Sequence, residues 1–408
     1  MSVRRVAMFS VHTSPLAQPG AGDGGGMNVY VRALALSLAR AGVACDVFTR
    51  REHAEQPPVL EVEEGFRVVH VPAGPAAPVP KQLLPQLVDP FVDGVLDHLE
   101  RQGDGYDALH ANYWLSGAVA HRLKHILDRP LVATFHTLDR VKAEVGVGDD
   151  PAVRARVESD VVRCADLVLA STDEEHKQLV DLYDADPERV EIVPPGVEHE
   201  AFFAGDSEAA RRALGVSGRK VLLFVGRIQP LKGADLAVRC LAALDDPSVI
   251  LLVVGGPSGP EGEGELVRLH ALVDQLGLDA QVRFVRPQRH DRLVGYYQAA
   301  DVCLVPSRTE SFGLVALEAA ACGTPVVAAA VGGLRSLVRH GRTGFLVEGH
   351  APLDYAAPVA RLLGDATLAA DMSRRAAAGS ADYTWSIAAA KLRRLYGDLE
   401  VRALVQCQ

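Results

Sequence analysis

Short runs of apolar, often β-branched residues alternate with longer amphipathic segments through the first half of the sequence. Such apolar runs predict buried strands, and apolar residues at helical spacing predict helices between them. The predicted strands are 6–11, 44–49, 67–71, 108–111, 131–134 and 167–171, and the predicted helices are 27–41, 86–102 and 153–164. This alternation is typical of parallel βαβ layers.

The alternation stops at Pro194-Pro195-Gly196 and then restarts. A helix is predicted at 209–214, followed by strands at 221–226, 248–255, 281–285, 302–306, 325–329 and 344–347. From Tyr383 onward, apolar residues at helical spacing predict a closing helix. The 408 residues therefore predict an α/β chain of two Rossmann-like domains, 1–196 and 197–382, with a C-terminal helical segment, 383–408. Ligands are expected at the C-terminal ends of the strands.

Composition narrows the function classes. Hydrophobic residues make up 48% and charged residues 23% of the chain, which indicates a globular protein. The formal net charge of −10 argues against a general nucleic-acid binder, whereas a small phosphorylated ligand needs only a few cations. The longest apolar tracts, 249–254 and 323–331, are shorter than the roughly 18 residues of a membrane helix. No targeting segment is evident, and we expect a soluble, cytoplasmic protein.

The pattern of cysteines also favours a reducing compartment such as the cytoplasm. They are scattered without a C-x-x-C pair, mostly within apolar segments, which favours buried small hydrophobic residues over a disulfide or metal scaffold. The six are Cys45, Cys164, Cys240, Cys303, Cys322 and Cys407.

A glycine-rich segment, Gly20 to Gly25, formally matches the G-x-G-x-x-G pattern, and Asp46 follows about 20 residues later. A nicotinamide-dependent oxidoreductase would use these residues, but His12 to Pro19 separates the glycines from the strand, so the turn is not tight. We favour a glycine loop whose amides approach an anionic ligand, with Asn28 able to hydrogen-bond a polyol. A loop without a binding role remains the alternative.

Two cations follow the predicted strand at 221–226. Arg227 and Lys232 are five residues apart across a turn that contains Pro230, so both can converge on one site. Two such cations beside a helix N-terminus would stabilise a leaving diphosphate. Two solvated surface cations are the alternative. The sequence has no G-x-x-x-x-G-K-[ST] motif, which excludes a P-loop ATPase.

Two carboxylates, Glu310 and Glu318, follow the predicted strand at 302–306. Glu310 is expected in the loop, Ser311 at the N-cap of the next helix, and Glu318 within its apolar run. An unpaired carboxylate there would be costly to bury. Because carboxylates accept hydrogen bonds from vicinal hydroxyls, one can hold a ribose and the other a sugar.

Arg227 and Lys232 together with Glu310-x7-Glu318 resemble the donor site of retaining family 4 glycosyltransferases with the GT-B fold. Further segments resemble the narrower family of D-inositol 3-phosphate glycosyltransferases of mycothiol biosynthesis in actinobacteria: 12–20, 25–30, 113–117, 136–138 and 255–259. The resemblance implies two Rossmann-like domains facing a central cleft, with 383–408 packing back on the first, and a homodimer. The implied reaction moves N-acetylglucosamine from UDP-N-acetylglucosamine to 1D-myo-inositol 3-phosphate with retained configuration, through same-face attack.

The same resemblance implies roles for individual residues. The donor is bound by Gln18, Pro19, Gly26, Arg227, Lys232, Gln288, Glu310 and Glu318. Catalytic roles fall to Arg227, Lys232, Glu310 and His136. The acceptor is bound by His12, Asp23, Gly24, Gly25, Gly26, Met27, Asn28, Lys81, Tyr113, Thr137 and Arg154. The chemistry requires no metal, although a structural Mg²⁺ is allowed near Tyr297, Gln298, Ala300 and Thr324.

Some positions depart from the family pattern. Residues that are common in the family are replaced at four places: Glu158-Ser159-Asp160, Asp139-Arg140, Ser171 and Gln288. These departures keep other acceptors open, such as fructose 6-phosphate in a sucrose-phosphate-synthase-like reaction. A sugar-nucleotide sensor without catalysis is a further alternative.

Overall fold

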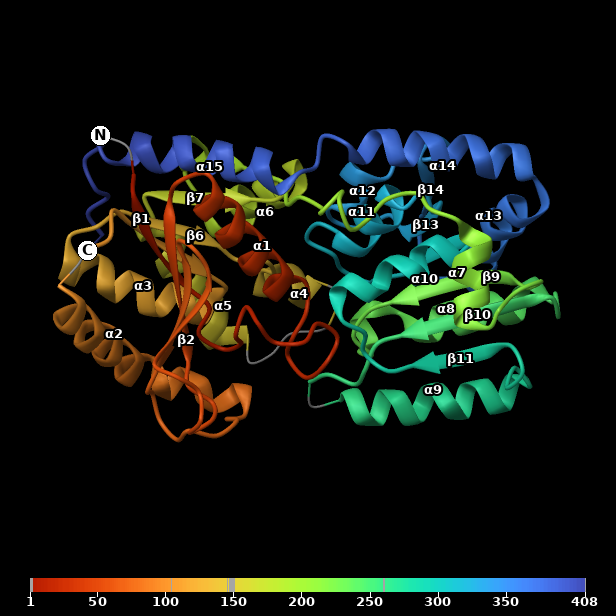
Figure 1. Ribbon diagram of the computed structural model, residues 1–408, viewed down its shortest axis with the longest axis horizontal. Helices are drawn as coiled ribbons and strands as arrows, with labels where there is room; N and C mark the ends of the chain where they lie inside the picture. The colour runs from red at the N-terminus through yellow and green to blue at the C-terminus, as the bar shows by residue number, and fades with distance from the viewer. Residues whose placement is uncertain (1–2, 104, 145, 147–150, 260, 408) are drawn as a thin grey trace. The chain divides into compact units, whose positions relative to one another are not determined.

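The computed structural model describes residues 3–103, 105–144, 146, 151–259 and 261–407 (Figure 1). The chain divides into two compact units. The first comprises residues 1–17, 27–196 and 385–408, and the second comprises 18–26 and 197–384. The glycine-containing segment 18–26, which the sequence analysis grouped with the first domain, thus belongs to the second unit.

The first unit is built on an eight-stranded sheet in the order β3-β4-β2-β1-β5-β6-β7-β8. All neighbouring strands are parallel except the antiparallel pair β3 and β4. Strands β1, β6 and β7 have near-continuous apolar sequences, which suit strands covered on both faces. The strands are β1 (Arg5–Phe9), β2 (Ala44–Arg50), β3 (Val59–Glu63), β4 (Phe66–Val71), β5 (Ala108–Asn112), β6 (Leu131–Thr134), β7 (Leu167–Ala170) and β8 (Val190–Ile192).

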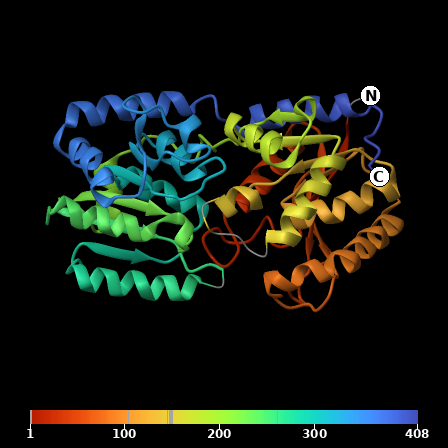
Figure 2. The ribbon, with the colours of Figure 1, turned by 180° about the vertical axis from the view of Figure 1, so that it is seen from behind.

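Helices connect these strands, and Figure 2 shows α2, α3 and α5 together on one side of the sheet. The C-terminal helix α15 returns to this unit, where the Tyr396 hydroxyl lies 2.6 Å from Nδ1 of His110 on β5. The helices are α1 (Gly26–Arg40), α2 (Val88–Gln102), α3 (Trp114–Leu127), α4 (Asp139–Glu144), α5 (Pro151–Cys164), α6 (Asp173–Tyr183) and α15 (Trp385–Leu399).

The second unit contains a six-stranded parallel sheet in the order β11-β10-β9-β12-β13-β14. Its strands are β9 (Lys220–Val225), β10 (Val249–Val254), β11 (Val282–Val285), β12 (Val302–Val305), β13 (Val326–Ala329) and β14 (Gly344–Val347). Its helices are α7 (Ser207–Leu214), α8 (Ala234–Leu244), α9 (Gly262–Leu276), α10 (Leu293–Ala299), α11 (Leu314–Ala321), α12 (Leu334–Leu337), α13 (Pro352–Gly364) and α14 (Ala366–Ser380).

Each sheet has a point where the strand order changes direction. In the first unit β1 lies between β2 and β5, and in the second β9 lies between β10 and β12. Open α/β sheets bind ligands at the carboxyl ends of the strands at such a point. The loops after β1, β5, β9 and β12 are therefore where candidate site residues are expected.

Two details differ from the sequence-based expectation. Strand β3 was not predicted, because it is an edge strand whose side chains are all at least partly exposed, so it lacks a buried apolar run. Helix α11 begins at Leu314 with Gly313 as its N-cap, at a φ of 104°, rather than at Ser311. Glycine adopts this left-handed conformation without the steric cost of a Cβ.

The scattered cysteines predicted buried small hydrophobic residues rather than a disulfide scaffold, and one pair differs from this expectation. Cys164 at the end of α5 is bonded to Cys407, across a sequence separation of 243 residues. Cys45, Cys240, Cys303 and Cys322 are free and buried, as expected. The spacing rules used for the sequence consider nearby cysteines, so they do not detect a pair that only the return of the C-terminal segment brings together.

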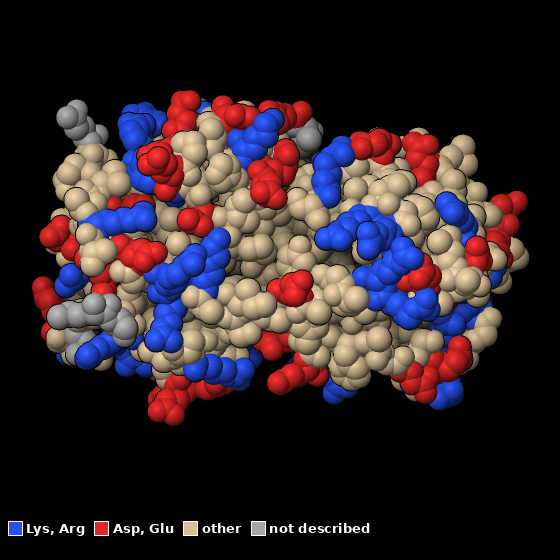
Figure 3. All heavy atoms as spheres, turned by 90° about the horizontal axis from the view of Figure 1, so that it is seen from above, with Lys and Arg blue, Asp and Glu red and all other residues tan. Residues whose placement is uncertain are grey.

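Two surface properties agree with the composition. On the face in Figure 3, acidic side chains are scattered and several basic side chains gather in groups. Among the described residues, every helix is too short or too polar to span a bilayer.

Candidate active site

Tyr113 is the centre of a cluster in the first unit. It follows β5, and two cations lie against its ring: Lys81 Nζ is 5.1 Å and Arg154 Cζ is 4.9 Å from the ring centroid. The His12 ring packs on the same tyrosine at a centroid distance of 4.5 Å. Cations at these distances are attracted by the electron-rich ring face. Three further predicted acceptor residues thus gather around Tyr113.

Arg154 is fixed by a buried network. Its Nε donates to Glu158 at 2.7 Å, and its Nη2 donates to the hydroxyl and carbonyl oxygens of Thr137 at 3.0 and 2.7 Å. Glu158 also accepts the backbone N–H of Asp139 at 2.9 Å and the hydroxyl of Tyr183. Burial alone would lower the pKa of Arg154, but Tyr113, Glu158 and Asp139 outweigh it and raise that pKa. Arg154 is therefore held charged and in one orientation.

Two donors of this cluster lack a partner. Arg154 Nη1 and the Tyr113 hydroxyl are both buried, and neither has a hydrogen-bond partner among the described residues. Leaving buried polar groups unpaired costs roughly 1–3 kcal/mol each, so such groups call for a ligand or another explanation. Beside Lys81, these two donors form a site suited to a small anion.

The backbone at two predicted site residues is strained. Tyr113 has φ 77° and ψ 158°, a region that is almost restricted to glycine, and His136 has φ 61°. Each such conformation costs about 1–3 kcal/mol and concentrates at functional sites. The other non-glycine residues with positive φ among the described residues are Asp128, Asp184 and Asp245 at helix C-termini, where the conformation is ordinary.

His136 follows β6 and is held by its neighbours. Its Nε2 lies 3.0 Å from Oδ1 of Asn112, and its ring meets Tyr30 edge-on at 4.7 Å. Burial, with a smaller effect of His110, lowers the pKa of His136 to about 3. The imidazole is therefore neutral at physiological pH and can serve as a hydrogen-bonding group without a charge.

Asn28 and Met27, two further predicted acceptor residues, have other contacts in the first unit. The Asn28 amide donates to the Thr13 hydroxyl at 2.8 Å and to the Ser14 carbonyl. Met27 is packed partly against the apolar core. Residues 23–26 belong to the second unit, so the predicted acceptor set is divided between the units.

In the second unit, Lys232 and Glu310 form an ion pair. Lys232 Nζ donates to Oε2 of Glu310 at 2.6 Å, and both side chains are partly exposed. Lys232 lies in the turn after β9 and Glu310 in the loop after β12, the two strands that flank the change of direction. The pair is therefore where an α/β sheet binds its ligand.

Glu318 on α11 is buried but compensated. One carboxylate oxygen lies 2.7 Å from Nε2 of His290, and the other accepts the Tyr297 hydroxyl at 2.7 Å. Each oxygen retains further acceptor capacity, so a ribose hydroxyl can still be bound. His290 was not predicted from the sequence as a site residue. The predicted cost of burying Glu318 was the only signal that a partner was required, and it did not identify which one.

Arg227 lies beside the glycine-containing segment. Its Nη1 donates to the Ser258 hydroxyl at 3.5 Å, and a Cβ at Gly25 would lie only 3.2 Å from its Nε. Close by in the same unit, the Gln18 side chain donates to the backbone carbonyl of Gln288. These contacts gather several predicted donor-binding residues within one unit.

Glycines allow the loops to approach so closely. A Cβ at Gly255 would lie 1.8 Å from the carbonyl oxygen of Gly226, and one at Gly332 would lie 1.9 Å from that of Glu310. Both have positive φ, so only glycine fits without displacement. These close approaches bring the loop after β9 against the loop after β10, and the loop after β12 against the segment at Gly332.

The predicted magnesium ligands offer oxygens but no carboxylate. The Thr324 hydroxyl donates to the Tyr297 carbonyl at 2.6 Å, and Gln298 Nε2 donates to the Phe203 carbonyl at 2.8 Å. Oxygen ligands suit Mg²⁺. Thr324 and Gln298 thus already donate to backbone carbonyls, and we derive no step through a metal.

Asp46, the acidic residue that a dinucleotide-binding site would use, has a structural role instead. Asp46 is buried and accepts hydrogen bonds from Arg5, Arg67 and Tyr106. These bonds outweigh burial and lower the pKa of Asp46. Its carboxylate is thus a structural group rather than one available to a ribose.

Two family profiles match successive parts of the chain. Residues 25–196 match the glycosyl transferase 4-like domain, and residues 206–378 match the glycosyl transferases group 1. A relative from Geodermatophilus obscurus, named D-inositol 3-phosphate glycosyltransferase, is 50% identical over 383 residues, 91% of this chain and 85% of the relative. The chain belongs to the group 1 glycosyltransferases.

A second relative of this glycosyltransferase, D-inositol 3-phosphate glycosyltransferase 2 from Catenulispora acidiphila, is 47% identical over 404 residues, 96% of this chain and 94% of the relative. Among solved structures, sucrose-phosphate synthase from Thermosynechococcus elongatus matches with a TM-score of 0.89 and 33% identity, covering 97% of this chain and 99% of that chain. The predicted family and the GT-B fold of the glycosyltransferase are confirmed.

Proposed function

We propose that this glycosyltransferase moves N-acetylglucosamine from UDP-N-acetylglucosamine to 1D-myo-inositol 3-phosphate with retained anomeric configuration, as in mycothiol biosynthesis. The observation that carries the proposal is the Tyr113 cluster. Two cations lie against one ring, and two buried donors there lack partners. The names of the full-length relatives support the choice of acceptor.

On this proposal the first unit binds the acceptor phosphate. Lys81 supplies a charge, Arg154 Nη1 and the Tyr113 hydroxyl donate hydrogen bonds, and Thr137 keeps Arg154 in place. Charge-assisted hydrogen bonds to phosphate are shorter and stronger than neutral ones, so this combination favours a phosphorylated polyol over a neutral one. His12, Asn28, Met27 and the segment 23–26 are proposed to contact the polyol.

The second unit is proposed to bind the donor. Arg227 and Lys232 stabilise the charge that develops on the leaving UDP. Glu310 positions the sugar and Glu318 holds the ribose. Gln18, Pro19, Gly26 and Gln288 are proposed to contact the nucleotide. Neutral His136 is proposed to hydrogen-bond the transferred sugar.

Two further expectations stay predictions. The first is a structural Mg²⁺, which would use Tyr297, Gln298, Ala300 and Thr324 and on which the proposed reaction does not depend. The second is the homodimer that the family resemblance implies.

A UDP-release assay tests the proposal. The donor is UDP-N-acetylglucosamine, and the parallel acceptors are inositol 3-phosphate, free inositol and fructose 6-phosphate. We expect release that depends on inositol 3-phosphate. Release with fructose 6-phosphate alone would favour the second candidate, a sucrose-phosphate-synthase-like reaction, which the similarity to that enzyme supports. No release with any acceptor would contradict both.

A further inference from the structure

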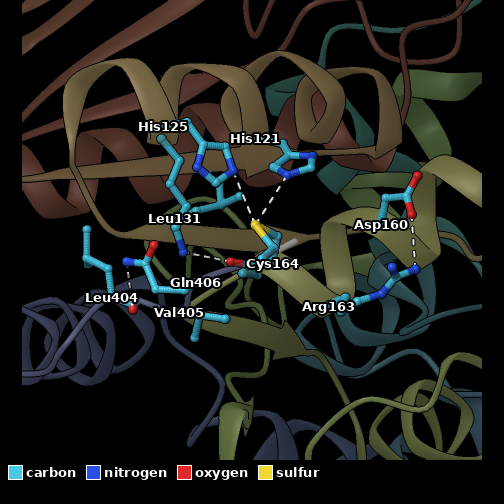
Figure 4. Close-up of a disulfide and its surroundings, with 12 residues drawn as sticks. His121, His125, Leu131, Asp160, Arg163, Cys164, Leu404, Val405 and Gln406 are labelled. Atoms are coloured by element: carbon cyan, nitrogen blue, oxygen red, sulfur yellow. Dashed lines mark hydrogen bonds and ion pairs between the residues drawn. A yellow bond between two sulfur atoms is a disulfide. The ribbon is translucent and has the colours of Figure 1, made fainter.

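Outside the candidate active site, four metal-ligating side chains gather in the first unit. His121 and His125 lie one turn apart on α3, Cys164 is the last residue of α5, and Cys407 belongs to the C-terminal segment after α15. Their ligand atoms all lie within 4.8 Å of one another. Figure 4 shows both imidazole rings pointing toward sulfur. No other group of three or more His, Cys, Asp or Glu side chains among the described residues is arranged in this way.

The distances fit a tetrahedral zinc ion. Nε2 of His125 lies 3.2 Å from Sγ of Cys407 and 3.5 Å from Sγ of Cys164, and Nε2 of His121 lies 3.6 Å from Sγ of Cys407. A tetrahedral ion with Zn–S of about 2.3 Å and Zn–N of about 2.0–2.1 Å separates its nitrogen and sulfur ligands by about 3.6 Å. Three of the four nitrogen–sulfur distances of a zinc site are therefore already close to their coordinated lengths.

The scaffold around the four residues is braced. Lys124, between the two histidines on α3, donates to the Cys164 carbonyl at 2.7 Å and to the Asp166 carboxylate at 2.8 Å. The other Asp166 oxygen accepts the backbone N–H of Val405 at 2.7 Å. These bonds hold the C-terminal segment, two residues before Cys407, against the end of α5.

We propose that, in the reduced chain, His121, His125, Cys164 and Cys407 bind one Zn²⁺. Two thiolates and two imidazoles in tetrahedral arrangement select zinc among common divalent metals. Four protein ligands make a closed, structural site. It ties the C-terminal segment to α3 and α5. The Cys164–Cys407 disulfide is then the metal-free, oxidised state of the same site, because coordination requires both sulfurs as separate thiolates.

This site is distinct from the proposed transferase chemistry. None of its residues is assigned to donor or acceptor, so zinc binding can fail without affecting the proposed function, and the reverse also holds.

Zinc binding to the purified full-length chain tests the proposal. The chain is reduced with a phosphine, freed of metal, and titrated with Zn²⁺ in competition with a chromophoric chelator. We expect one Zn²⁺ per chain. Co²⁺ in its place should show the thiolate charge-transfer band and the intense visible bands of a tetrahedral site. Binding that leaves Co²⁺ without the thiolate band would overturn the proposal, as would the absence of one tight equivalent.

Two variants and one control make the test specific. Cys407 is partly exposed and His125 is exposed, so Cys407→Ser and His125→Asn should fold, which circular dichroism checks. Each should weaken Zn²⁺ binding by more than about 100-fold, since losing even an outer-shell partner costs about 10–100-fold. His350→Asn, an exposed histidine of the second unit, should bind as the wild type does. Equal affinity in Cys407→Ser and wild type would contradict the assignment.

Discussion

The two units differ in whether their candidate ligand-binding groups already have partners. Around Tyr113 in the first unit, Lys81 and Arg154 lie against the aromatic ring. Arg154 is paired with Glu158 through its Nε, but its Nη1 and the Tyr113 hydroxyl lack hydrogen-bond partners among the described residues. In the second unit, Lys232 is paired with Glu310, and buried Glu318 has His290 and Tyr297 as neighbours. The first arrangement is prepared to receive an anion. In the second, Lys232 already has a carboxylate partner, so an incoming anion must compete with Glu310 for it.

This difference suggests a division of labour under the proposed function. A site with unpaired donors discriminates between phosphorylated and neutral acceptors, because an acceptor without the phosphate leaves those donors unpaired. In the Lys232–Glu310 pair, the lysine ammonium can shift its interaction from the carboxylate to the leaving diphosphate as negative charge develops there. Substitutions in the second unit should therefore affect rate, and those around Tyr113 should affect acceptor affinity.

The largest effect is expected from Lys232→Ala. Removing one preorganised charge-stabilising group should lower kcat for UDP release by about 100-fold or more. Lys177→Ala, which removes an exposed lysine on α6, is the control. If Lys232→Ala and Lys177→Ala had similar kcat values, the second unit would not carry the chemistry.

Acceptor affinity should respond next, to Lys81→Ala and Arg154→Lys. Each weakens a charge-assisted contact worth about 1.5–3 kcal/mol, so KM for inositol 3-phosphate should rise by about 10–100-fold. The Kd for UDP, measured by calorimetry, should stay the same. The lysine at position 154 keeps a charge beside Glu158, so the fold is retained. An equal loss of UDP affinity would show that the acceptor assignment is wrong.

A buried carboxyl of the first unit gives a pH-dependent prediction. Burial, opposed by hydrogen bonds from Ser171, raises the pKa of Glu175 from 4.5 to about 7. Its contribution to stability is present below pH 4.5 and is lost as the pH rises to about 7, because only the unfolded state ionises freely. Glu175→Gln should therefore stabilise the chain by about 1–3 kcal/mol at pH 8 and hardly at pH 4.5.

Urea unfolding at the two pH values measures this effect. A stability gain of Glu175→Gln that is the same at both pH values would contradict the assigned ionisation.

The smallest effect is expected from Tyr113→Phe. The ring and its two cations remain, and only the unpaired hydroxyl is lost. KM for the phosphorylated acceptor should rise by about 2–10-fold, as expected for one neutral hydrogen bond of about 0.5–1.5 kcal/mol. Tyr296→Phe in the second unit is the control. A KM unchanged from wild type would remove the hydroxyl from the proposed phosphate site.

The extent of prediction from sequence differs between local and long-range features. Buried parallel strands such as β9 and β10 have continuous apolar runs, and loops that follow such strands meet at one edge of a sheet. The proximity of Lys232 and Glu310 could therefore be predicted from the order of strands and loops along the chain. Contacts that depend on side-chain placement were not: neither the His290–Glu318 contact nor the strained backbone of Tyr113 has a local sequence signal.

Contacts between segments far apart in the sequence also could not be predicted. The Cys164–Cys407 bond requires knowing that the segment after α15 ends beside α3 and α5. The placement of residues 18–26 with the second unit likewise depends on packing against residues more than 200 positions away. Neither follows from periodicity or motif spacing.

The most direct test of the central claim is the ratio of kcat/KM for inositol 3-phosphate to that for free inositol, measured in wild type and Lys81→Ala with saturating UDP-N-acetylglucosamine. If the Tyr113 cluster binds the phosphate, the ratio is large in wild type and falls about 10–100-fold in Lys81→Ala, while turnover of free inositol is unchanged. A ratio that is the same in both proteins would contradict the account.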